Sequence, residues 1–160
     1  MRLKFGQFVI DADLERTQAY YKTDPGIGCE CAGCRNFERA AAELPAAVRD
    51  FFCSLGIDPA KPAEVYVNCT QEDGRLWYGG FYHLCGTLVQ GEGGWHTVSK
   101  DANTKTSAWD RESCWAVDEH FHVAFTEDIA LLEPSFPEPA LQLEIDASLP
   151  WLLEEENDYP

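Results

Sequence analysis

Three cysteines lie within six residues, at Cys29, Cys31 and Cys34, and a Pro/Gly turn leads the chain into them. The sequence after Cys34 takes a helical period, with apolar side chains at i, i+3, i+4 and i+7. Two thiolates in the spacing C-x-x-C can point at one tetrahedral ion, and Zn²⁺ is a metal that such ligands hold. This cluster constrains the fold most, because a bound metal would join the start of a helix to the segment that supplies the remaining ligands.

The remaining ligands should come from a distant part of the chain. His83 and Cys85 lie two residues apart in a predicted strand, so their side chains should point to the same face of it. We therefore predict a Zn²⁺ site built from Cys31, Cys34 and His83 and completed by Cys29 or Cys85. Such a site would fix the first of two consecutive helices to a sheet.

Two other interpretations of the cysteine cluster stay open. A C-x-x-C motif at the start of a helix can be redox-active, because the helix dipole and the free backbone N–H groups favour a thiolate. Arg35 would add positive charge there, but a thioredoxin-like motif follows a buried strand, whereas a turn precedes this one. The thiols could also be ordinary buried side chains, which is common for free cysteine.

The hydrophobic pattern predicts helices first and strands later. Short helices are expected over 13–21, 34–43 and 46–55, the last of them ending at Gly56. Strands are expected over 2–10, 64–70, 76–89, 115–125 and 141–145. This order predicts an α+β fold in which two consecutive helices pack on a mainly antiparallel sheet. We predict one domain over 1–153, followed by an acidic, frayed tail over 154–160.

Two further segments carry specific expectations. The strand at 76–89 is apolar on both faces, which indicates a central position in the sheet. The last strand alternates, with one set of side chains directed inward and the other outward. The inward set is Leu141, Leu143 and Ile145, and the outward set is Gln142, Glu144 and Asp146. Residues 91–113 have little apolar content, so we predict a long loop there.

Charge narrows the range of partners. The formal net charge is −16, and no Lys or Arg follows Arg111, whereas thirteen acidic residues do. Such a surface repels the phosphates of nucleic acids and anionic membranes, and it attracts basic partners or cations. We therefore predict a basic protein or a cation as partner, no binding to nucleic acid and no association with a membrane, although acidity is also a common means of staying soluble.

The cysteine count and the N-terminal residues bear on the compartment. Seven cysteines is an odd number, and residues 1–10 contain no sustained apolar run of the kind found in export signals. No stretch approaches the roughly 20 apolar residues that span a bilayer. We predict a cytoplasmic protein with free or metal-bound thiols.

Three blocks of the sequence resemble a family of small, acidic, uncharacterised bacterial proteins with no assigned function. The blocks are Cys31-x-x-Cys34-Arg35-Asn36, Gly56-Ile57-Asp58-Pro59-x-Lys61-Pro62 and Gly79-Gly80-Phe81-Tyr82-His83. The resemblance covers most of the chain and implies that Cys31, Cys34 and His83 belong to one site. It implies no catalytic residues.

Two classes of function are consistent with these features. The first is a binding module that a Zn²⁺ ion stabilises and that meets a basic partner through its acidic half. The second is a metal- or thiol-dependent enzyme with its site at Cys29–Cys34 and residues 91–113 as a lid. A closed site with four protein ligands favours the first class, and an open coordination position or a reactive thiol favours the second.

Overall fold

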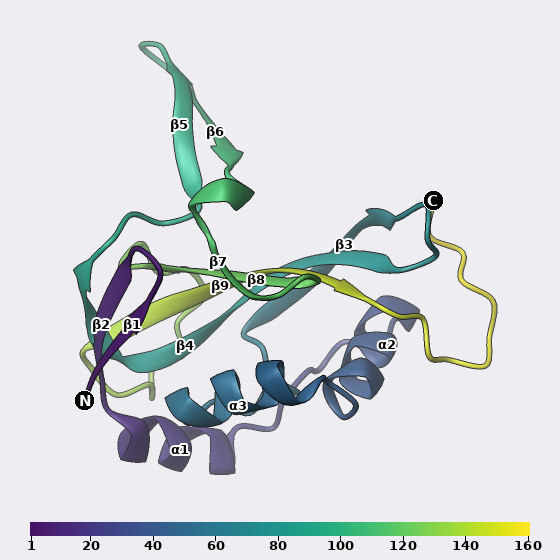
Figure 1. Cartoon of the computed structure of the whole chain (residues 1–160), viewed down its shortest axis with the longest axis horizontal. Coiled ribbons are helices and arrows are strands. Elements are labelled where there is room, and N and C mark those ends of the chain that lie inside the picture. The colour runs from purple at the N-terminus through teal and green to yellow at the C-terminus, as the bar shows by residue number, and fades with distance from the viewer.

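The computed structural model describes residues 1–160 and shows three helices on one side of an antiparallel sheet (Figure 1). The helices are α1 (Leu14–Thr23), α2 (Ala32–Ala41) and α3 (Ala46–Leu55). The strands are β1 (Arg2–Phe5), β2 (Phe8–Ala12), β3 (Glu64–Thr70), β4 (Leu76–Gln90), β5 (Trp95–Lys100), β6 (Lys105–Trp109), β7 (Trp115–Asp118), β8 (Phe121–Thr126) and β9 (Ala140–Leu149). The predicted α+β fold is confirmed.

Strand β4 is the centre of the sheet, as its two apolar faces predicted. It pairs with β9 along one side, and the order across the sheet is β1-β2-β4-β9-β8-β7. On its other side, the first part of β4 pairs with β3 and the last part pairs with β2. The strand can serve both because it is 15 residues long, about 50 Å at about 3.3 Å per residue.

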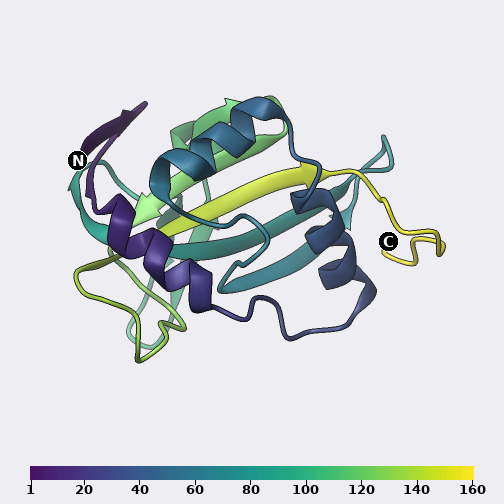
Figure 2. The ribbon, with the colours of Figure 1, turned by 90° about the horizontal axis from the view of Figure 1, so that it is seen from below.

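The three helices lie across one face of the sheet (Figure 2). Helices α2 and α3 bury the apolar stripes that the helical period predicted, and their buried members are Phe37, Ala40, Ala41, Val48, Phe51, Phe52 and Leu55. Helix α3 ends at Gly56, whose φ of 73° lies in the left-handed region that glycine reaches without strain. None of the helices has the length and the apolar content that crossing a membrane requires.

Two segments predicted as single strands are hairpins. Residues 2–10 fall into β1 and β2, which pair antiparallel around Gly6. Gly6 has a φ of 59° and makes a reversal there instead of the bulge that the sequence suggested. Residues 115–125 likewise divide into β7 and β8, which pair with each other.

The prediction of a long loop over residues 91–113 is also wrong. Residues 95–109 form the antiparallel hairpin β5–β6, and a short 3₁₀ helix at Arg111–Ser113 follows it. The hairpin rises from the face of the sheet opposite the helices (Figure 1). Polar residues can alternate in an exposed two-stranded ribbon, so low apolar content did not distinguish a hairpin from a loop here.

The face of β9 that was predicted to point outward is covered by tryptophan side chains. The predicted alternation is confirmed, but Gln142, Glu144 and Asp146 are buried, with Asp146 only 3% exposed. Indole N–H groups of Trp77 and Trp109 donate to Asp146 across the sheet face. The expectation that these acids lie in solvent is therefore wrong, because hydrophobic alternation assigns side chains to a face and does not reveal what packs on it.

Candidate metal site at the start of α2

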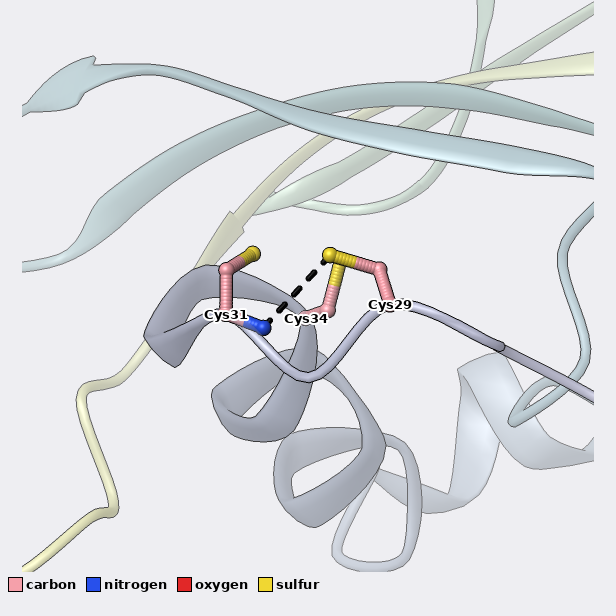
Figure 3. A group of neighbouring side chains, drawn as sticks. All are labelled: Cys29, Cys31 and Cys34. Atoms are coloured by element: carbon pink, nitrogen blue, oxygen red, sulfur yellow. Dashed lines mark hydrogen bonds between the residues drawn. The ribbon is translucent and has the colours of Figure 1, made fainter.

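The cysteine cluster forms where an irregular segment turns into α2. Cys31 is the residue that caps the start of this helix, and Cys34 lies within its first turn. The backbone N–H of Cys31 donates to Sγ of Cys29 at 3.5 Å, which brings the preceding cysteine back over the helix start (Figure 3). The three Sγ atoms consequently lie within 4.8 Å of one another. This group could hold a metal ion, as the sequence predicted for these three residues.

The three thiols differ in burial, and the pKa values of Cys31 and Cys34 shift in opposite directions. Cys29 and Cys31 are exposed and Cys34 is buried. Interaction with the backbone amide of Cys34 and with the Cys29 side chain lowers the pKa of Cys31 to about 7. Burial, together with the neighbouring thiols, raises the pKa of Cys34. Cys31 thus becomes a thiolate more readily than Cys34, and the thiolate is the form that binds a metal.

The cysteines line a cavity with a volume of about 520 Å³. It lies between the start of α2 and strand β3, and the sulfur atoms are directed to this side (Figure 3). Apolar and aromatic side chains form its other walls, among them Ile27, Val65, Val67, Tyr78 and Tyr159. A metal held by the three thiols would therefore be accessible to a small molecule.

The C-terminal residues pack against this site. The hydroxyl of Tyr159 accepts a hydrogen bond from the backbone N–H of Gly33, and Thr70 on β3 binds the backbone carbonyls of Tyr159 and Pro160. Residues 154–160 are therefore not frayed. Nothing in the local sequence indicates this contact, because Tyr159 lies 126 residues after Gly33.

The two residues after Cys34 anchor the helix. Arg35 forms an ion pair with Glu155 in the C-terminal segment. The buried amide of Asn36 donates to the Tyr78 hydroxyl and to the carbonyl of Pro150, and its oxygen accepts the backbone N–H of Leu152. The block C-x-x-C-R-N therefore combines two of the three possible metal ligands, Cys31 and Cys34, with two residues that fix α2 to the end of the chain.

Gly33 leaves the space that Tyr159 occupies. A Cβ at Gly33 would lie 2.7 Å from the Tyr159 hydroxyl and 2.9 Å from Cγ2 of Val67. We expect Gly33→Ala to displace Tyr159 and to lower the free energy of unfolding by about 1 kcal/mol through the lost hydrogen bond. Carboxypeptidase digestion and urea denaturation would measure the two effects. Gly28→Ala is the matched control, since no atom lies within 4 Å of its added Cβ, and equal effects of both substitutions would contradict this role of Gly33.

The structure does not bring His83 into the cysteine cluster. Its Nε2 lies 3.1 Å from Oε1 of Gln142, an oxygen that also accepts the backbone N–H of Ala130. Burial lowers the pKa of His83, which favours the neutral imidazole. The residue of β4 that meets the start of α2 is Tyr78, and His83 lies five positions further along, roughly 16 Å at about 3.3 Å per residue.

Cys85 is likewise separate from the cluster. It is buried on the same strand face as His83, and its thiol points to the carbonyl of Pro137 at 3.9 Å. The prediction that His83 and Cys85 share a face is consistent with the strand, but that face is not the one on which α2 packs. The ligand atoms that the structure gathers are those of Cys29, Cys31 and Cys34 alone.

Residues 91–113 do not form a lid over the cysteines. Their hairpin stands on the opposite face of the sheet, where Trp95 and Trp109 bind Glu144 and Asp146 (Figure 1). The segment that covers part of the cysteine site is instead the C-terminal one, through Tyr159.

Comparison with known proteins adds no relative: no protein-family model, no curated protein and no solved structure matches the chain. The resemblance to small acidic bacterial proteins consequently stays a prediction.

Proposed function

We propose that this protein is a binding module stabilised by one Zn²⁺ ion, which Cys29, Cys31 and Cys34 hold. The observation that carries the proposal is the approach of three Sγ atoms to within 4.8 Å at the start of α2. Thiolates are soft ligands that select Zn²⁺ and Cu(I) over Mg²⁺ and Ca²⁺, and Zn²⁺ is the usual structural ion among them. The donor set of the site therefore fits zinc.

The metal would act mainly on the segment that precedes α2. Residues 24–31 contain no regular secondary structure, and Cys29 and Cys31 are exposed at the surface. A metal that binds the folded form and not the unfolded chain adds its binding free energy to stability. The three cysteines would thereby hold this segment, the first turn of α2 and the cavity in one arrangement.

The cavity supports a binding role for the same site. A tetrahedral zinc site takes four ligands, and the cluster supplies three. The fourth would come from water or from a molecule that enters the cavity of about 520 Å³. The module would in this way recognise a small ligand with a donor atom for the metal and an apolar part for Val65, Val67 and Tyr78.

Metal analysis of the purified protein tests the proposal. We expect about one zinc per chain after purification under reducing conditions, and three thiols that react only after chelation. Cys34→Ser should remove the metal, whereas Cys53→Ser, which changes an exposed thiol on α3, should leave it in place. Retention should weaken as the pH falls below about 7, because protons compete with the metal for the thiolates. Protein without stoichiometric metal and with seven freely reacting thiols would refute the zinc site.

A metal- or thiol-dependent enzyme is the second candidate. The open side of the cluster and the lowered pKa of Cys31 favour it. The thiol titration separates the two candidates. A structural zinc protects all three thiols from an alkylating agent. In an enzyme with a reactive thiol, Cys31 is alkylated faster than Cys53 in the metal-loaded protein. The same result would support a redox role only if a disulfide between two of the three cysteines also formed reversibly.

The proposed module belongs in a reducing compartment such as the cytoplasm. All seven cysteines are free, three of them in positions where their thiols could pair with one another. Oxidising compartments favour disulfides between such thiols, and a reducing one leaves them available to a metal.

A basic protein is the partner that the surface charge supports. Glu144 and Asp146 are buried and contribute nothing to this surface. The exposed acids after Arg111 still include Glu112, Glu119, Glu127, Asp128, Glu133, Glu138, Glu154, Glu155, Glu156 and Asp158. We expect a basic partner to be recovered in pull-downs at low salt and lost at high salt, because screening weakens long-range attraction. Recovery of nucleic acid, or of no salt-sensitive partner, would contradict this expectation.

A further inference from the structure

A second cavity lies on the opposite face of the sheet from the cysteines, beneath the hairpin β5–β6. Its volume is about 90 Å³. The residues that line it include Tyr66, Trp77, Trp95, Trp109, Glu144 and Asp146. Neither the metal site nor the acidic surface accounts for this arrangement.

The aromatic side chains form walls that remain partly open to solvent. The rings of Trp95 and Trp109 meet edge to face, with centroids 5.5 Å apart and planes at 62°. Trp95 is 50% exposed and Tyr66 is 43% exposed. The ring of Tyr66 lies against Gly79, where a Cβ would come within 2.6 Å of it. Two large aromatic side chains thus stay in contact with water at the mouth of a preformed cavity.

The two carboxylates of the cavity differ in their partners. Arg111 neutralises Asp146 through two hydrogen bonds, and both oxygens of Asp146 also accept an indole N–H. Glu144 is 9% exposed and forms no ion pair. Its Oε2 accepts the indole N–H of Trp95 at 3.0 Å, and its Oε1 has no hydrogen-bond partner in the protein although it keeps some solvent access. The cavity therefore contains one buried carboxylate without a cation.

The environment of Glu144 disfavours its ionised form while no cation is bound. Burial raises the pKa of Glu144 to about 7, and the nearby carboxylate of Asp128 adds to this effect. The charged and titratable groups around the cavity are Glu64, Tyr66, Arg111, Cys114, His122, Asp128 and Asp146. Burial lowers the pKa of His122, which favours its neutral imidazole. Arg111 is then the one permanent cation among these groups, and Asp146 already engages it.

We propose that this cavity binds a methylated ammonium group, which Tyr66, Trp95 and Trp109 hold by cation–π contacts and Glu144 by its charge. Aromatic faces next to a carboxylate attract quaternary ammonium ions. An unmethylated ammonium carries three donors and is strongly hydrated, whereas the cavity offers Oε1 of Glu144 as its one free carboxylate oxygen. The volume is several times the roughly 10–15 Å³ that one water requires on this measure, so a compact group of a few heavy atoms has room.

An inorganic cation fits the cavity less well. Mg²⁺ needs about six oxygen ligands and Ca²⁺ six to eight. Both oxygens of Asp146 already accept hydrogen bonds from Trp77, Trp109 and Arg111, which leaves too few free oxygens for either metal.

Titration of the full-length protein with tetramethylammonium and with choline tests the proposal, with tryptophan fluorescence and calorimetry as readouts. We expect saturable binding of both. The uncharged analogue 3,3-dimethyl-1-butanol has the shape of choline without the charge and should bind at least about tenfold more weakly. This comparison needs no substitution, so it is independent of effects on folding. Equal binding of the analogue, no binding of either cation, or displacement of choline by stoichiometric Mg²⁺ would overturn the proposal.

Substitutions locate the site. Glu144→Gln keeps the shape and an acceptor for Trp95 but removes the charge, and Trp95→Leu removes one wall. Each should weaken choline binding by about tenfold. Trp115→Phe changes an exposed tryptophan of β7 outside the cavity and should leave the affinity unchanged. A loss of affinity in Trp115→Phe equal to that in Trp95→Leu would place the binding elsewhere and overturn the proposal.

Two further experiments identify the source of the methylated group and test whether its binding is independent of the metal site. A peptide with trimethyllysine that binds more tightly than choline supports a protein ligand, and the reverse order supports a free small molecule. The Cys34→Ser variant should bind choline as the unsubstituted protein does, because the cysteines lie across the sheet. Failure of the zinc proposal and failure of this one are therefore distinguishable.

Discussion

Replacing Phe51 with alanine should lower the free energy of unfolding by about 3–5 kcal/mol, because it removes a buried aromatic ring and leaves a cavity. Phe51 is 6% exposed on the face of α3 that meets the sheet. Its ring packs edge to face on Phe5 with centroids 5.1 Å apart and on Phe52 at 5.5 Å. Urea denaturation of the variant and of the unsubstituted protein measures the difference.

Cys53→Ala is the control for this prediction. Cys53 lies on the same helix but on its exposed face, so the substitution should change stability by no more than about 0.5 kcal/mol. A loss of less than about 1 kcal/mol for Phe51→Ala would mean that α3 presents another face to the sheet. Alanine has the highest helix propensity, so a large loss for both variants would mean that the face of α3 with Cys53 is packed as well.

The helical half of the fold was predictable because its signals are local. The spacing of Phe37, Ala40 and Ala41, and that of Val48, Phe51 and Phe52, specifies which face of each helix is apolar without reference to the rest of the chain. Gly56 ends α3 as expected. The start of α2 lies two residues before the predicted position, within the ordinary uncertainty of helix boundaries.

The hairpins were not predictable because a reversal and a bulge share the same sequence signal. Gly6 permits either, and the choice follows from the pairing of β2 with β4, which is a contact distant in sequence. The hairpin at 95–109 depends on Glu144 and Asp146, which anchor Trp95 and Trp109 from more than thirty residues away. A window of the sequence that contains only the polar hairpin does not include these partners.

The candidate metal site was likewise predictable only in part, because some of its residues are close in sequence and others are distant. Cys29, Cys31 and Cys34 come together because they are close in sequence and one helix start positions them. A distant ligand depends on which part of β4 faces α2, and that is set by how the sheet and the helices pack. Tyr78 occupies the position that His83 was expected to hold. The contact of Tyr159 with Gly33 has no local signal at all.

Asp146→Ala should lower the free energy of unfolding by about 3 kcal/mol, even though the alternation of β9 suggested a carboxylate in water. Asp146 accepts hydrogen bonds from the indole N–H groups of Trp77 and Trp109, each at 2.8 Å. Its removal leaves both indole groups partly buried without an acceptor, at about 1–3 kcal/mol for each fully buried donor. Arg111 is half-exposed, and water would replace much of what its guanidinium loses.

A second ion pair with the same donor atoms, but exposed to solvent, is the control for this prediction. Arg2 binds Asp11 through the same two atoms that Arg111 uses on Asp146, at 2.9 and 2.8 Å, but the Arg2 pair lies in solvent. Asp11→Ala should therefore cost much less than Asp146→Ala. Only Asp146→Ala should also expose residues 95–109 to protease, because Trp109 and Arg111 hold the base of the hairpin to β9. Equal stability losses, or a hairpin that stays protected in Asp146→Ala, would show that the tryptophans pack on the sheet without needing the buried carboxylate.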